Sequence, residues 1–91
     1  MSDSIDPVEL LGSKPRLRLL RVLLNSREIN ITRLAREAGV TYEAARRHLS
    51  QLCAAGLVRE RRVGRIRIYS VVPDHPIVPL LRRILSWKST L

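Results

Sequence analysis

The chain of 91 residues carries a formal net charge of +9, from 17 lysines and arginines against 8 aspartates and glutamates. A chain of this length folds as one domain, so an enzyme with separate substrate and cofactor domains is excluded. Hydrophobic residues make up 45% of the sequence, which is enough for a small core and excludes general disorder. A single cysteine excludes an internal disulfide framework and a zinc site of the CxxC type.

The excess of positive charge favours a polyanionic partner, which is usually nucleic acid or an acidic membrane surface. Fifteen of the 17 basic residues are arginines, whose planar guanidinium suits phosphates and the edge of guanine. The aromatic residues are only Tyr42, Tyr69 and Trp87, so a stacking platform for single strands is not expected. No apolar run approaches the ~20 residues that span a bilayer, and no signal sequence is apparent. We therefore expect a cytoplasmic, nucleoid-associated protein without a membrane partner.

The first part of the chain predicts two helices and a small strand. After a tail at residues 1–6, residues 7–11 predict a short helix that ends at Gly12. A longer helix is predicted at residues 14–25, where apolar and basic positions separate. Residues 28–29 predict a small strand. The apolar face of the longer helix comprises Leu17, Leu20, Val22, Leu23 and Leu24, with Arg16, Arg18 and Arg21 mainly on other faces.

Two further helices follow, joined by a tight turn. Asn30 predicts the N-cap of a helix at residues 31–38, and Gly39 supplies the left-handed residue that ends it. Thr41 predicts the cap of the next helix, at residues 41–55. The buried positions predicted here are Ile31, Leu34, Ala35 and Ala38 in the first helix, Val40 in the turn, and Ala45, Leu49, Leu52 and Cys53 in the second helix.

After Gly56 the apolar period changes to two, which is typical of strands. Residues 57–62 predict one strand and residues 66–71 predict the returning strand, with a glycine in the short tip between them. The returning strand alternates isoleucines with basic and aromatic residues, so these two sets occupy opposite faces. A connector with three prolines then leads to a last helix at about residues 77–88.

This order of elements predicts an α+β fold that is mostly α, in which a pair of helices is followed by a two-stranded β-wing. The chain here resembles the winged helix-turn-helix regulators of the arsenical-resistance-repressor (ArsR) type. The matching segments are PRLRLL at 15–20, ITRLAREAGV at 31–40, RHLSQL at 47–52 and AGLV at 55–58. The resemblance covers about residues 12–72, the expected core of a single winged helix-turn-helix domain over residues 1–91. Residues 73–91 are then expected to form the connector and a C-terminal dimerisation helix.

The predicted interface with duplex DNA lies on the second helix of the pair and on the wing. The helix at residues 41–55 has the dimensions to lie in a major groove with its N-terminal residues at base edges. Because the inward stripe must face the other helices, the side chains predicted to point outward are Tyr42, Glu43, Arg46, Arg47 and Ser50. Arg46 and Arg47 are the candidates for guanine or phosphate contacts. The full set predicted to contact DNA is Thr41, Tyr42, Glu43, Arg46, Arg47 and Ser50 in this helix, Arg61, Arg62, Arg65 and Arg67 in the wing on the backbone or minor groove, and Thr32, Arg36 and Arg16 as phosphate anchors elsewhere.

Several of these residues also have a plain structural interpretation. Glu43 either accepts from a cytosine amino group or matches the positive end of its helix. The wing arginines are otherwise a solvated face. His48 stands in the Arg-His-Leu signature of the family, which implies a supporting role without catalysis or metal binding. Cys53 is interpreted as a small core residue, with a redox switch as the alternative.

Metal and enzyme sites are not expected. Metal-sensing proteins of the resembling family carry cysteines at the start of the first helix of the pair, whereas residues 28–34 contain none. The last helix has no histidine or acidic cluster. We therefore predict no metal, no cofactor and no obvious small-molecule effector. Paired carboxylates, a nucleophile with its base and a Gly-rich phosphate loop are also missing, so no catalytic residue is assigned.

These observations predict a sequence-specific regulator of transcription, expected to be a repressor, that binds double-stranded DNA as a homodimer. A thin core is commonly supplemented by oligomerisation, and the last helix is very apolar for a terminal helix. The predicted dimer contacts are Ile77, Leu80, Leu81, Ile84, Leu85 and Trp87, with help from residues 7–24. Two alternatives stay open: an architectural chromatin-type protein with little sequence preference, and a winged helix that serves as a protein-interaction module.

Overall fold

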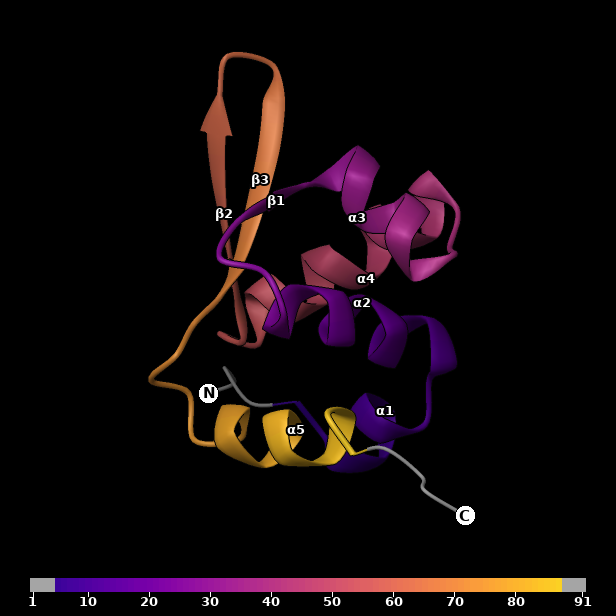
Figure 1. Ribbon diagram of the computed structural model, residues 1–91, viewed down its shortest axis with the longest axis vertical. Helices are drawn as coiled ribbons and strands as arrows, with labels where there is room; N and C mark the ends of the chain where they lie inside the picture. Colours follow the sequence, from indigo (N-terminus) through magenta and orange to yellow (C-terminus); the bar gives the residue numbers. More distant parts are fainter. Residues whose placement is uncertain (1–4, 88–91) are drawn as a thin grey trace.

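The computed structural model describes residues 5–87, which form helices and short strands in the predicted order (Figure 1). These elements are α1 (Pro7–Leu11), α2 (Lys14–Leu24), β1 (Ile29–Asn30), α3 (Ile31–Ala38), α4 (Tyr42–Ala54), β2 (Val58–Val63), β3 (Ile66–Val71) and α5 (Val78–Leu85). Most ends lie within one residue of the prediction. The last helix is shorter than predicted, since it ends at Leu85, and Lys88 lies outside the described residues.

Side-chain caps explain where the central helices begin. Ser13 caps α2, Asn30 caps α3 and Thr41 caps α4. At the last of these, the Thr41 hydroxyl accepts from the Ala44 backbone N–H at 3.1 Å, which satisfies a donor that has no partner inside the helix. Gly39 ends α3 in the left-handed conformation at φ 71°. The tight turn between α3 and α4 therefore follows from local signals in the sequence.

The wing is an antiparallel hairpin of β2 and β3 that projects beyond the helices (Figure 1). Its register pairs Val63 with Ile66 beside the tip, where Gly64 adopts φ 63°, a conformation that favours glycine. The sheet has a third strand, because β1 pairs with β3 at the base and places Ile29 opposite Tyr69. This third strand joins the wing to the segment just before α3. The wing is thereby held in a fixed relation to the pair of helices.

The core is built largely from leucine side chains of the helices. All four inward positions predicted for α3 are buried, as are Ala45, Leu49 and Leu52 of α4, whereas Cys53 is half-buried. Val40, predicted to be buried, packs half-buried against the same cluster. The largest fully buried side chains are Leu10, Leu19, Leu20, Leu23, Leu34, Leu49, Leu52, Leu57 and Leu81.

The last helix, α5, has an inner and an outer apolar side. Leu81 is 1% exposed and packs with Val78 into the core of its own chain, so it does not form the predicted dimer contact. Ile77 and Leu85 are half-buried against the same core. The exposed apolar side chains of this segment are Leu80, Ile84 and Trp87. No helix within residues 5–87 has the length and apolar character needed to cross a bilayer.

Candidate nucleic-acid interface

The outer face of α4 is polar and open to solvent. Because the other side of the helix packs against α2 and α3, Arg46, Arg47 and Ser50 point outward and are exposed. In the first turn, Tyr42 is 45% exposed and lies beside the exposed Glu43. The predicted outward orientation of these five side chains is confirmed.

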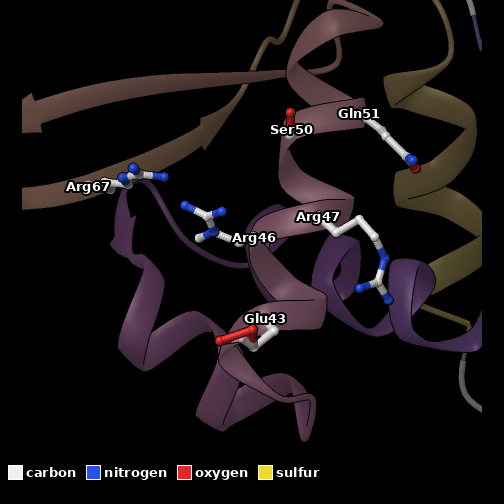
Figure 2. Close-up of a pocket in the computed structure, with 6 residues that line it drawn as sticks. All are labelled: Glu43, Arg46, Arg47, Ser50, Gln51 and Arg67. Atoms are coloured by element: carbon white, nitrogen blue, oxygen red, sulfur yellow. The ribbon is translucent and has the colours of Figure 1, made fainter.

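A surface hollow of about 550 Å³ lies between α4 and the wing (Figure 2). Figure 2 shows Arg46 extending from α4 toward Arg67 on β3, whereas Arg47 and Gln51 extend from the other side of the helix. The hollow is lined by Glu43, Arg46, Arg47, Ser50, Gln51 and Arg67. Because three guanidinium groups and a single carboxylate line this concave surface, it attracts anions.

A second hollow of about 330 Å³ continues this surface toward the start of α3. Arg67 lines both hollows. The second is lined by Asn30, Ile31, Thr32, Tyr42, Arg65, Ile66 and Arg67. The structure thus brings together most of the side chains predicted to contact DNA, from α3, α4 and the wing.

Two wing arginines are paired with carboxylates. Arg61 donates from Nε and Nη2 to the Glu28 carboxylate at 3.1 and 2.7 Å, and this bond lowers the pKa of Glu28. Arg67 Nε lies 3.7 Å from Glu60 Oε2, which also accepts from the Tyr69 hydroxyl at 3.0 Å. Burial, followed by the bond to Glu60, raises the pKa of Tyr69 to about 12. These contacts brace the wing against itself and against the segment before β1.

The remaining arginines of this surface are solvated. Within residues 5–87, Arg46, Arg47, Arg62 and Arg65 form no ion pair, and all four are exposed. Their charge is therefore not compensated by a neighbouring carboxylate and acts outward on an approaching polyanion. Arg62 and the exposed Arg36 line neither hollow, so they lie outside the concave part of the surface.

Arg16 does not lie on this surface, and its predicted role as a phosphate anchor is wrong. Its side chain is 6% exposed, because position 16 lies three, four and seven residues before the buried leucines of α2 and so shares their face. Nε donates to His48 Nδ1 at 3.2 Å and Nη1 donates to the Glu9 carbonyl at 3.3 Å. Nη2 donates to the amide oxygen of Gln51. All three guanidinium nitrogens are thus bonded inside the protein.

Gln51 lines the larger hollow although it was not among the predicted contacts. It lies four residues after Arg47 and therefore on the same side of α4, a spacing that is visible in the sequence. Thr41, which was predicted, is exposed and its hydroxyl oxygen is engaged as the cap of α4.

His48 and Cys53 have the structural character predicted for them. The imidazole of His48 is half-buried, and burial, followed by the charges of Arg16 and Arg47, lowers its pKa. Cys53 packs half-buried against the core, where burial raises the pKa of its thiol and favours the protonated form. In the part of the chain that the structure describes, no three His, Cys, Asp or Glu side chains gather as a metal site would require.

No family model and no curated protein matches the chain. Among solved structures, the antimony-specific transcriptional repressor AntR is 31% identical with a TM-score of 0.70, over 86% of this chain and 66% of that one. The chain thus spans just under two thirds of AntR. A possible transcriptional regulator for arsenical resistance is 30% identical with a TM-score of 0.66, over 90% of this chain and 81% of that one. A homodimeric winged helix-turn-helix DNA-binding domain from Mycobacterium bovis, of a possible ArsR-family regulator, is 26% identical with a TM-score of 0.66, over 86% and 69% of the two chains.

Proposed function

The chain belongs to the winged helix transcriptional regulators of the ArsR type, and we propose that it binds double-stranded DNA at specific sites as a homodimeric repressor. The observation that carries this proposal is the exposed hollow lined by Arg46, Arg47 and Arg67, in which Arg46 of α4 extends toward Arg67 of the wing (Figure 2). The structural neighbours of the chain are transcriptional regulators, which are not enzymes. We propose that the single domain over residues 1–91 carries this DNA-binding function.

In the proposed complex α4 lies in the major groove. A helix of 13 residues is about 20 Å long and fits a groove about 12 Å wide. Arg46 and Arg47 then point at the groove floor or walls, where the guanidinium fork matches guanine O6 and N7. Ser50 and Tyr42 contact phosphates or a thymine methyl, and Glu43 accepts from a cytosine amino group. These contacts supply the sequence preference.

The wing and α3 hold the phosphate backbone in this arrangement. Arg62 and Arg65 are exposed without an ion pair among the described residues. They therefore reach phosphates at a slightly lower cost than Arg61, whose exposed pair with Glu28 must first be broken. Thr32 and Arg36 add contacts from α3. Each phosphate that is neutralised steepens the salt dependence of binding, with a slope of about −0.9 per contact.

A homodimer explains the exposed apolar side chains far from the wing tip. Leu80, Ile84 and Trp87 are exposed on the C-terminal segment, and Val8 and Leu11 are exposed on α1. In Figure 1 these two helices lie at the end of the molecule opposite the wing tip. A two-fold dimer through this end places two α4 helices on one side of the duplex, about one turn of DNA apart, and therefore reads an inverted repeat.

Repression is proposed because AntR is described as a repressor, and a bound dimer blocks access to the DNA that it covers. AntR is described as specific for antimony. This chain has only Cys53 as a thiol, and that thiol packs against the core. We therefore propose no metal effector for it.

The proposed function is tested by selecting bound fragments from random duplex DNA at about 50 and about 200 mM salt. An enriched inverted repeat at both salt concentrations is expected. Fragments without enrichment, combined with a steep loss of binding at the higher salt, would contradict sequence-specific regulation and favour an architectural role.

A pair of double variants tests whether α4 makes the contact. The variant with Arg46→Ala and Arg47→Ala is expected to lose at least tenfold affinity for the selected duplex, as two lost guanidinium contacts imply on the order of 2 kcal/mol or more. The control carries Arg18→Ala and Arg21→Ala, which remove the same charge from exposed positions of α2. Equal binding by the two double variants would favour the interpretation as a protein-interaction module.

A further inference from the structure

Arg16 is the one charged side chain buried among residues 5–87. Its three acceptors are uncharged: His48 Nδ1, the Glu9 carbonyl and the Gln51 amide oxygen. A buried guanidinium without a carboxylate partner is strongly penalised by desolvation, and an apolar side chain of similar volume often stabilises a fold as well or better. Stability alone therefore does not explain an arginine at this position.

The acceptors of Arg16 belong to two different helices. Glu9 lies in α1, whereas His48 and Gln51 are three residues apart in α4 and therefore on one side of that helix. This side lies between the buried stripe of α4 and the outer face that carries Arg47. Because the guanidinium is planar and is bonded through all three nitrogens, it fixes how far α4 is rolled about its own axis relative to α1 and α2.

We propose that Arg16 is a positioning residue that sets the angle at which α4 presents its outer face to DNA, an inference that rests on the proposed DNA-binding function. With a helix radius of about 5 to 6 Å, a roll of about 20° moves the side-chain ends by about 2 Å. A bidentate bond to a base depends on distance and direction and does not survive such a shift. Attraction to phosphates depends mainly on charge and is affected less.

The bond from Arg16 requires a neutral His48, because Nδ1 acts as the acceptor. The cations that face the imidazole are Arg16 from α2 and Arg47 from α4 itself. Two acids, the α1 N-cap Asp6 and Glu9 within α1, line a hollow next to Arg16. Protonation of His48 replaces the acceptor by a donor and sets two cations against each other. Protonation of His48 also adds a positive charge, which by itself favours binding to DNA. Acidification therefore strengthens binding to any duplex, but it weakens the preference for the specific site.

The first test compares Arg16→Met with Arg18→Met, using protein that urea unfolding shows to be folded. Arg18 is exposed on the same helix, so this control removes an equal charge without removing a buried bond. Each variant is titrated with the duplex selected by the unaltered protein and with a random duplex of equal length. We expect Arg16→Met to lose on the order of tenfold affinity for the selected duplex and to match Arg18→Met on the random one. Equal affinities of the two variants for both duplexes would overturn the proposal.

The second test follows site preference, the ratio of the two affinities, between about pH 8 and about pH 5. The preference of the unaltered protein is expected to fall with pH, whereas that of His48→Asn, which keeps an acceptor near the position of Nδ1 but does not titrate, is expected to stay constant. The same pH profile in both proteins would overturn the positioning role.

A third variant keeps the proposal testable if Arg16→Met does not fold. His48→Leu changes a half-buried residue that lines neither hollow and removes one of the bonds of Arg16, so a smaller loss of site preference is expected, and an unchanged preference overturns the proposal. Absence of duplex binding by the unaltered protein would instead overturn the proposed function, and with it this inference. Duplex binding by the unaltered protein therefore distinguishes a failure of the positioning role of Arg16 from a failure of the proposed function.

Discussion

His48 makes the stability of the fold depend on pH. Burial, then Arg16 and Arg47, lower the pKa of the imidazole from its ordinary value of 6.5, so the folded chain binds fewer protons than the unfolded chain just below that pH. The contribution of His48 to stability is therefore complete above pH 6.5 and is lost as the pH falls through the lowered folded pKa. The urea midpoint should fall more steeply over this range in the unaltered protein than in His48→Asn. Equal slopes for the two proteins would contradict this assignment.

The Thr41 cap is a second single-residue contribution. Thr41→Ala removes the hydroxyl that accepts from the Ala44 N–H and should lower the free energy of unfolding by about 1 kcal/mol. Thr32→Ala is the control, since Thr32 is exposed within α3 and caps no helix. Urea unfolding of both variants measures the difference. A loss as large in Thr32→Ala would show that the cap is not its source.

For single residues, the sequence predicts the exposure of a side chain well when the local helical period decides it. The prediction is poor when hydrogen-bond acceptors from distant segments decide it. The outward side chains of α4 follow from its period and are confirmed. Arg16 is buried among leucines because Glu9, His48 and Gln51 supply acceptors from α1 and α4. The spacing between position 16 and the leucines of α2 already places Arg16 on the buried face. The hydrogen bonds that compensate for burial of its guanidinium come from other helices and are not visible in the local sequence.

Among the elements, the wing allows a direct test of which arginines contact phosphates. Arg65→Ala should reduce the salt slope of duplex binding by about 0.9, the value for one phosphate contact. Arg61→Ala should leave the slope unchanged, because the Arg61 guanidinium is already bonded to Glu28. Titrations at several salt concentrations measure both slopes. A larger change for Arg61→Ala than for Arg65→Ala would contradict the assignment.

The elements themselves were largely predictable because their ends carry local signals. Asn30, Gly39 and Thr41 bound α3 and α4, and the switch to a period of two marks the hairpin. The sheet was less predictable. A two-residue strand such as β1 has little signal of its own, and its pairing with β3 depends on the fold that brings the two segments together.

At the scale of the whole molecule, the outer side of α5 should carry self-association. Ile84→Glu places a carboxylate on the exposed apolar side and should convert a dimer into a monomer, because burial of an unpaired charge is strongly unfavourable. Ser86→Glu is the control, an exposed position on the same segment with the same change of charge. Sedimentation equilibrium reports both masses. An unchanged mass for Ile84→Glu would exclude this side as the interface.

Which side of α5 faces inward was not predictable from its composition. Apolar residues surround much of this helix, and the sequence alone therefore assigned Leu81 together with Leu80 and Ile84 to the dimer. The structure separates them, because Leu81 is 1% exposed whereas Ile84 is 56% exposed. Which side of α5 faces the core depends on how the proline-rich connector orients this helix, and that orientation is a property of the whole fold.

NMR mapping with the selected duplex shows whether α4 and the wing form the surface that contacts duplex DNA. The largest changes in amide chemical shift are expected at residues 41–51 and 61–67, with small changes at residues 7–11. Changes concentrated at residues 78–87, with the amides of α4 unaffected, would contradict the proposed DNA-binding surface.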